Sequence, residues 1–243
     1  LDAFSQQGIS TFGAGMNAAQ AHAPLTLAIN GRRFKFFSAY WFRQYMEQDC
    51  AFYAHPRRAG VACISGGLTE KLRAEKRSDD PATLIVLAHW GQDYQWTRPQ
   101  QRQLAKRLMD AGADLIIGSG PHIPGDILRT GQGWVLYSIG NGVFNSNGEY
   151  QSRGMPPYGF IVRLSLGGTQ PALELQPIFT DNQQTFWQPR PVSETEFEHV
   201  ITILREQGTR ITEQPRQEGA WIKRQKNARP VIVLPLDIRF AGR

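Results

Sequence analysis

The sequence lacks several features that would place it in a familiar class at once. No apolar run approaches the ~20 residues that a transmembrane helix requires. Cys50 and Cys63 are the only cysteines, and their spacing does not indicate a metal site. They could pair in an oxidising compartment, but we expect two unpaired structural thiols. With 41% hydrophobic and 20% charged residues, the composition is that of a folded globular protein with a sizeable core.

The first residues lack an initiator methionine and a signal peptide. Leu1-Asp2-Ala3-Phe4 has instead the pattern of the second half of an amphipathic helix. We therefore expect the chain to be a fragment or a processed product that lacks upstream sequence. Its compartment is then not predictable from a targeting signal.

A module for binding nucleic acid is also missing, although the formal net charge is +6. Residues 25–29 and 32–40 flank Asn30-Gly31, which is the strongest short signal for a β-hairpin. The aromatic residues of this region alternate with basic ones and fit a buried hairpin face. Residues 40–60 are aromatic, polar and irregular, and we expect a surface loop there. No nucleic-acid partner is expected.

Three short apolar runs organise the middle of the chain, at residues 84–88, 115–117 and 134–137. Continuous apolar runs bounded by turn residues predict strands buried on both faces, as in a sheet covered by helices. The runs end in polar segments, which are His89-Trp90-Gly91, Gly118 to His122, and Ser138-Ile139-Gly140-Asn141. In α/β sheets ligands bind beyond the carboxyl ends of the strands, so we expect these three ends to converge on one site.

The segment between the first two runs has the signals of a capped helix. Thr97 precedes Pro99, and Gln100 occupies the reciprocal capping position, while Gly112 ends the segment. A strand, a helix and a second strand form a βαβ unit. The strands that begin near Leu84 and Leu115 should therefore be parallel neighbours.

Two histidines at the strand ends, His89 and His122, are the main candidates for chemistry. Imidazole is the commonest metal ligand and titrates near neutral pH, so either could bind metal or act as a general acid or base. Asp93 is the acid nearest to His89 in the sequence, and Asp126 the one nearest to His122. A dinuclear hydrolytic centre also requires several carboxylates. The other histidines, His22, His55 and His199, are expected at the surface.

These motifs together resemble one known family. The resemblance rests on His89-Trp90-Gly91-Gln92-Asp93-Tyr94, Pro99, Gln101, Asp110 to Asp114, Gly118, Pro121-His122 and Tyr137 to Asn141, and more weakly on Gly13 to Asn17. This ordered set resembles the CapA family of poly-γ-glutamate capsule-synthesis proteins. The resemblance implies an α/β fold, a layered αββα sheet sandwich of the calcineurin-like metallophosphoesterase type, here incomplete at its N-terminus.

The resemblance also implies roles for individual residues. His89 and His122 would be metal-site or catalytic histidines, and Asp93 would join them where the family usually carries Glu. The substrate site would be lined by Trp90, Gly91, Tyr94 and Asn141. The first three of these residues follow His89 closely in the sequence. Gly120 replaces a histidine that many members have, and the family's first ligand motifs lie upstream of Leu1. The resemblance thus implies divalent metal ions in the full-length protein and no complete two-metal centre in this chain.

Two functions from different classes follow. The first is a capsule-polymer biosynthesis or processing protein of metal-dependent hydrolase type, an enzyme if the missing upstream ligands are present in the full protein. The alternative is a non-catalytic protein that binds an anionic polymer on the same fold. The implied partners are an anionic polymer or a phosphate or acyl substrate, with other capsule-synthesis proteins. By resemblance the location would be at a membrane or outside the cytoplasm.

The domain organisation is expected to change near residue 180. Residues 1–180 would form the partial CapA-like domain, with an antiparallel pair formed by residues 159–166 and 172–179 and joined through Gly167-Gly168. Residues 181–243 would form a linker, a helix capped by Ser193, and a charged tail.

Overall fold

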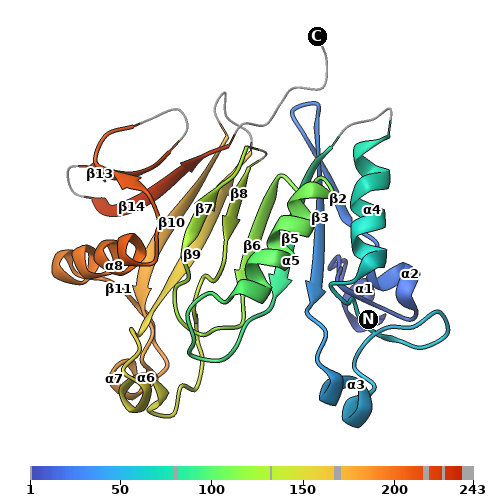
Figure 1. Ribbon diagram of the computed structural model, residues 1–243, viewed down its shortest axis with the longest axis horizontal. Helices are drawn as coiled ribbons and strands as arrows, with labels where there is room; N and C mark the ends of the chain where they lie inside the picture. Colours follow the sequence, from blue (N-terminus) through green and yellow to red (C-terminus); the bar gives the residue numbers. More distant parts are fainter. Residues whose placement is uncertain are drawn as a thin grey trace. The chain divides into compact units, whose positions relative to one another are not determined.

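The computed structural model describes residues 2–78, 82–131, 133–166, 171–215, 219–225 and 228–236. Helices and strands alternate along the chain, which confirms the predicted α/β class (Figure 1). The chain divides into two compact units. Of the described residues, unit 1 holds those up to 90 and 103–117, and unit 2 holds those in 91–102 and 118–236. None of the helices in the described ranges combines the length and apolar character needed to span a bilayer. The boundary expected at residue 180 stays a prediction.

Unit 1 is built on a sheet in which four strands lie side by side. Their order is β2 (Leu25–Ile29), β3 (Arg32–Tyr40), β5 (Thr83–His89) and β6 (Leu115–Ser119), the last of which ends in unit 2. Strands β2 and β3 are antiparallel around Asn30 and Gly31, which both have positive φ, so the hairpin prediction is confirmed. Strand β5 runs parallel to β3, and its residues Leu84, Ile85, Val86 and Ala88 are almost completely buried.

Helix α5 (Pro99–Asp110) connects β5 to β6. The backbone N–H of Asp114 donates to the carbonyl of Leu84 at 2.8 Å, so the two strands begin side by side and run in parallel, as predicted. The start of α5 differs by one residue from the expectation. Gln101, not Gln100, reaches back, and its Oε1 accepts from the backbone N–H of Arg98 at 3.1 Å. Arg98 rather than Thr97 is therefore the residue that precedes the helix.

The remaining elements of unit 1 are short. They are α1 (Asp2–Gln6), β1 (Ala14–Gly15), α2 (Ala18–Ala21), α3 (Gln44–Cys50), β4 (Gly60–Val61) and α4 (Gly66–Lys76). The region 40–60 is thus more ordered than a plain loop, because α3 lies within it. Both cysteines of this unit are free, as expected, and burial raises the pKa of Cys63 to about 11, so its thiol stays protonated.

Among the described residues, unit 2 contains a six-stranded mixed sheet and the antiparallel pair β7 (Ile127–Arg129) and β8 (Trp134–Leu136). The sheet has the order β11 (Arg190–Pro191), β10 (Ala172–Phe179), β14 (Ala228–Pro235), β13 (Ala220–Gln225) and β12 (Ile211–Thr212). Strand β9 (Tyr158–Ser165) pairs with β10 in antiparallel register, as predicted. The expected connection at Gly167-Gly168 lies outside the described residues.

Helix α8 (Glu194–Glu206) lies beside β13 and β14 (Figure 1). A capping box between Ser193 and Glu196 begins it, which confirms the predicted cap. Its apolar stripe is buried and consists of Phe197, Val200, Ile201, Ile203 and Leu204. The two short helices α6 (Glu149–Arg153) and α7 (Asn182–Thr185) are linked by a hydrogen bond from Gln151 to Asp181.

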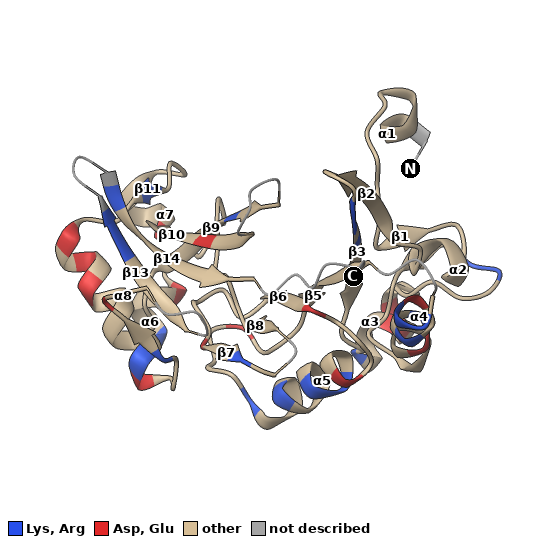
Figure 2. Cartoon of the chain, turned by 90° about the horizontal axis from the view of Figure 1, so that it is seen from above, with Lys and Arg blue, Asp and Glu red and all other residues tan. Residues whose placement is uncertain are grey.

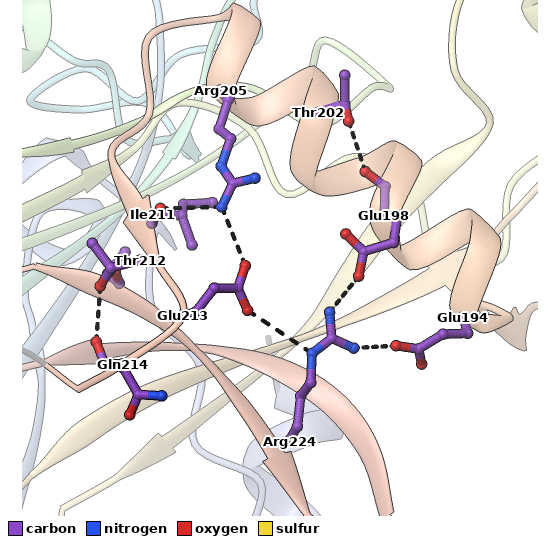
Figure 3. Close-up of polar contacts among 10 residues, drawn as sticks. Glu194, Glu198, Thr202, Arg205, Ile211, Thr212, Glu213, Gln214 and Arg224 are labelled. Carbon is purple, nitrogen blue, oxygen red and sulfur yellow. Dashed lines mark hydrogen bonds and ion pairs between the residues drawn. The ribbon is translucent and has the colours of Figure 1, made fainter.

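Ion pairs join the outer face of α8 to the sheet. Figure 2 shows acidic residues along α8 beside the basic stretch of β13. Arg224 pairs with Glu194 and Glu198, and its Nε lies 4.0 Å from Glu213 (Figure 3). Arg205 also reaches Glu213, at 3.4 Å. We name these five residues the Arg224 cluster; its side chains are 40–64% exposed.

Candidate functional site

The exits of β6 and β8 meet within unit 2. The backbone N–H of Ile139 donates to the carbonyl of Gly118 at 2.9 Å, and this bond aligns the end of β6 with the segment that follows β8. His122 follows the first segment and Asn141 the second. Their side chains are in contact, since His122 Nδ1 lies 2.7 Å from Asn141 Oδ1. Two of the three predicted strand ends therefore converge.

Residues that follow the end of β5 complete the surroundings of His122. Tyr94 stacks on the imidazole, with ring centroids 5.2 Å apart and an interplanar angle of 21°. Asp93 Oδ1 lies 4.0 Å from His122 Nε2. Phe144 contacts the same imidazole ring, with centroids 4.5 Å apart. The imidazole is thus held by two aromatic rings and has a polar group near each nitrogen.

A buried chain of hydrogen bonds continues from Asn141 to Tyr150 and Thr180. The Tyr150 hydroxyl lies 2.7 Å from Asn141 Nδ2, 3.1 Å from the His122 carbonyl and 3.1 Å from Thr180 Oγ1. Thr180 can donate to the Pro157 carbonyl at 3.2 Å. The His122 carbonyl can only accept a hydrogen bond, so the Tyr150 hydroxyl donates to it. Asn141 then donates to the Tyr150 oxygen through Nδ2. This orientation turns Asn141 Oδ1 toward His122 and places a proton on Nδ1.

Tyr94 occupies an unusual environment. Its backbone has a φ of +53°, and that of His122 has +64°, both in the left-handed region that favours glycine. Its hydroxyl is buried and has no hydrogen-bond partner among the described residues. Burial, followed by the nearby Tyr150 hydroxyl and two carboxylates, raises the pKa of Tyr94 to about 12. The guanidinium of Arg153 lies 5.6 Å from the ring centroid of Tyr94.

Close packing at Gly91 brings the loop after β5 against the loop after β6. Gly91 has a φ of +91°, and a Cβ there would lie 2.7 Å from Gln101 Nε2 and 2.7 Å from Pro121. The Tyr94 backbone N–H donates to the Pro121 carbonyl at 2.8 Å. A side chain at position 91 would separate these loops, so the glycine is required for the approach of Tyr94 to His122.

His89 and Trp90 belong to unit 1. The His89 ring is exposed and stacks on Tyr40, with centroids 4.4 Å apart, and its carbonyl accepts from the Trp41 backbone N–H. The Trp90 side chain is completely buried. The catalytic or metal-binding role of His89 and the substrate-binding role of Trp90 stay predictions. Asp126, the acid near His122 in the sequence, is buried and pairs with Arg102 at 2.9 Å.

The donors at this site fit a divalent metal only in part. His122 Nε2 and Asp93 Oδ1 could both face one ion, because their 4.0 Å separation is compatible with bonds of ~2.1 Å from each. Catalytic metal sites generally use at least three protein ligands. Within the part of the chain that the structure describes, no three His, Cys, Asp or Glu side chains gather in this way. These residues therefore do not make a metal centre by themselves.

Sequence reasoning missed four residues of the site, namely Phe144, Tyr150, Arg153 and Thr180. Tyr150 and Arg153 lie on α6, within a stretch rich in Asn, Gly and Ser. Tyr150 is only 2% exposed. It is the single aromatic residue between 145 and 157, which is the signal that could have identified it.

Comparison with known proteins agrees with the motifs. Residues 1–146 match the family described as bacterial capsule synthesis protein PGA_cap. The capsule biosynthesis protein CapA of Bacillus anthracis is 40% identical over 80 residues, which cover 30% of this chain and 20% of that protein. The PGA biosynthesis protein CapA of Bacillus subtilis (strain 168) is 41% identical over 73 residues, covering 30% and 18% respectively.

The matched stretch spans about a fifth of the length of these relatives. The family match is broader, since it covers 146 of the 243 residues and ends just beyond Asn141 and Phe144. It thus includes the loops that carry Asp93, Tyr94 and His122. The chain belongs to the family of bacterial capsule synthesis proteins of the PGA_cap type.

Proposed function

We propose that this chain is part of a metal-dependent, metallophosphoesterase-like hydrolase that acts on a capsule polymer such as poly-γ-glutamate during its synthesis or processing. The observation that carries the proposal is the state of His122. Asn141 Oδ1 accepts from Nδ1, so the lone pair of Nε2 remains available on the side of Asp93. A neutral imidazole in this state can accept a proton or bind a cation.

In this function His122 would act as a general base, and Asp93 and Asn141 would support it. Nε2 of His122 would take a proton from a water or a hydroxyl that attacks the acyl or phosphoryl group. The bond to the departing amine or alcohol then breaks, and His122 returns the proton to that leaving group. The Asp93 carboxylate would then stabilise the imidazolium by charge attraction, while Asn141 keeps the ring in place. A divalent ion, when bound, supplies Lewis-acid polarisation of the substrate. Where Nε2 of His122 binds such an ion instead of taking the proton, His122 and Asp93 would be the residues of unit 2 that hold it.

The proposal is tested in the complete protein, because the chain covers only part of its relatives. Release of glutamate oligomers from poly-γ-glutamate, and of an alcohol and a phosphomonoester from a phosphodiester, should be measured with manganese or zinc present. His122→Gln should reduce turnover by about 100-fold or more, the range of general acid–base catalysis. His199→Gln, at an exposed histidine of unit 2, should leave turnover unchanged. Full activity in the His122 variant would overturn the proposal.

Calorimetry on the chain itself tests the expected need for further ligands. Because no three His, Cys, Asp or Glu side chains gather among the described residues, titration with manganese or zinc should give weak binding or none. A tight isotherm with two sites would show that residues of this chain are sufficient for a dinuclear centre.

A binding protein for an anionic polymer is the second candidate. It is favoured by Arg153, which is 49% exposed and lies over the Tyr94 ring at the rim of the site. Under this function Arg153→Gln would weaken retention of poly-γ-glutamate, and His122→Gln would change no turnover because none would occur. Polymer retention without turnover in the metal-loaded complete protein would favour the binder over the hydrolase.

A further inference from the structure

We propose that Tyr150 is a positioning residue, which holds the Asn141 amide in one orientation and thereby keeps His122 in the Nδ1–H tautomer. The use of that tautomer in catalysis rests on the proposed function, but the tautomer itself does not. Tyr150 touches Asn141 and the His122 backbone, and none of its contacts reaches the reactive Nε2.

The network that contains Tyr150 is sealed from solvent. Asn141, Tyr150 and Thr180 are 7%, 2% and 1% exposed. They come from three separate elements, which are the exit of β8, helix α6 and the end of β10. Because water cannot replace a lost partner at these positions, each polar group depends on the others for its hydrogen bonds.

The Tyr150 hydroxyl discriminates between the two orientations of the Asn141 amide. In the assigned orientation it accepts from Nδ2 at 2.7 Å and donates to the His122 carbonyl at 3.1 Å. In the flipped orientation Asn141 Oδ1 would face the Tyr150 hydroxyl and accept a hydrogen bond from it. The His122 carbonyl would then lose its hydrogen-bond donor. Nδ2 would then face His122 Nδ1, which favours the tautomer with the proton on Nε2 and removes the lone pair there.

The contacts of Tyr150 fit this role better than a purely apolar one. A phenylalanine would fill the same space, and Tyr150 packs edge-on against Tyr94 with centroids 5.5 Å apart. The hydroxyl adds contacts to two polar side chains and one carbonyl. Burial raises its pKa, so it remains a donor across the physiological range.

The test is nitrogen NMR of the ¹⁵N-histidine-labelled protein at about pH 9, where imidazoles are neutral, with a chelator present. His122→Gln identifies the His122 signals by their loss. In the wild type the pattern should be that of a proton on Nδ1. Tyr150→Phe should lower the ratio of the Nδ1–H to the Nε2–H tautomer by about two- to tenfold, the factor that one net hydrogen bond supplies.

Tyr158→Phe is the matched control. Tyr158 is 4% exposed, and its hydroxyl lies 3.2 Å from Nδ1 of a different histidine, His199, so its loss should leave His122 signals unchanged. The double variant Asn141→Asp with Tyr150→Phe should restore the Nδ1–H tautomer, because a carboxylate accepts whichever way it turns. This rescue also separates a positioning role from misfolding.

Three results would overturn the inference. They are an Nε2–H tautomer in the wild type, an unchanged ratio in a folded Tyr150→Phe protein, and an equal change in Tyr158→Phe. Loss of turnover in the complete protein does not enter these measurements. An Nδ1–H tautomer in a protein without hydrolase activity would contradict the proposed function and leave the positioning role of Tyr150 supported.

Discussion

The network around His122 and the Arg224 cluster both join separate elements of unit 2, but they do so by different physical means. The His122 network is largely buried and is joined by hydrogen bonds, each with a specific donor or acceptor. The Arg224 cluster is made of charged side chains that are 40–64% exposed. Solvent can replace any bond of the cluster, whereas Asn141, Tyr150 and Thr180 of the network are almost completely buried.

This difference indicates which of the two groups of residues fixes the orientation of its side chains. Exposed ion pairs are screened by water and salt, and each contributes little to the free energy of unfolding. A buried polar group that loses its partner carries the full cost of desolvation. We therefore expect substitutions near His122 to change both stability and orientation, and substitutions in the cluster to change little.

The largest effect is expected at Asn141. Asn141→Leu removes the partners of His122 Nδ1 and of the Tyr150 hydroxyl, and should lower the free energy of unfolding by about 3 kcal/mol. Urea denaturation measures this loss. Asn145→Ala, at an exposed residue of the same loop, is the control and should cost well under about 1 kcal/mol. Equal losses in both variants would show that Asn141 contributes no more to the free energy of unfolding than an exposed residue of the same loop.

An intermediate effect is expected at Glu196, which accepts two hydrogen bonds from Arg190 at 2.6 and 2.7 Å. Arg190, and then the backbone and side chain of Ser193, lower the pKa of Glu196 to about 2. Glu196→Gln retains the size of the side chain and should lower the free energy of unfolding by about 1–2 kcal/mol at neutral pH.

The same pair gives a pH dependence of known direction. A folded-state pKa near 2, below the ordinary 4.5, stabilises the protein fully above about pH 4.5. That contribution is lost as the pH falls from 4.5 toward 2, because the unfolded chain binds the proton first. Unfolding curves at several pH values should converge for wild type and Glu196→Gln near pH 2. Parallel curves down to that pH would contradict the assigned pKa.

The smallest effect is expected in the Arg224 cluster. Arg224→Gln should lower the free energy of unfolding by less than about 1 kcal/mol, part of it from contact with the Phe197 ring 5.3 Å away. The difference from wild type should shrink when salt is raised. A salt-independent loss of several kcal/mol would place the cluster in the same class as the His122 network.

Local sequence signals predicted the parts of the fold that local physics determines. Asn30-Gly31 predicted the hairpin because both residues tolerate positive φ, and Ser193 with Glu196 predicted the start of α8. The strand ends predicted that His122 and Asn141 would meet, since neighbouring strands bring their exits together. The start of α5 was misplaced by one residue, because Thr97 and Arg98 are both compatible with a helix that begins with Pro99.

The supports of the site depend on distant contacts that no local pattern encodes. Thr180 follows β10 and lies 30 residues from Tyr150, and only the folded sheet brings it to α6. For Trp90 the resemblance implied a substrate-binding role, which stays a prediction, and its side chain is completely buried.

The central claim is that Asn141 and Tyr150 act as one unit in orienting His122. A double-mutant cycle of urea unfolding with Asn141→Leu, Tyr150→Phe and the combined variant tests it most directly. Because each single change already breaks the bond between the two side chains, their effects should not add, and we predict a coupling free energy of about 1 kcal/mol or more. Additive losses, with a coupling within about 0.3 kcal/mol of zero, would contradict the claim.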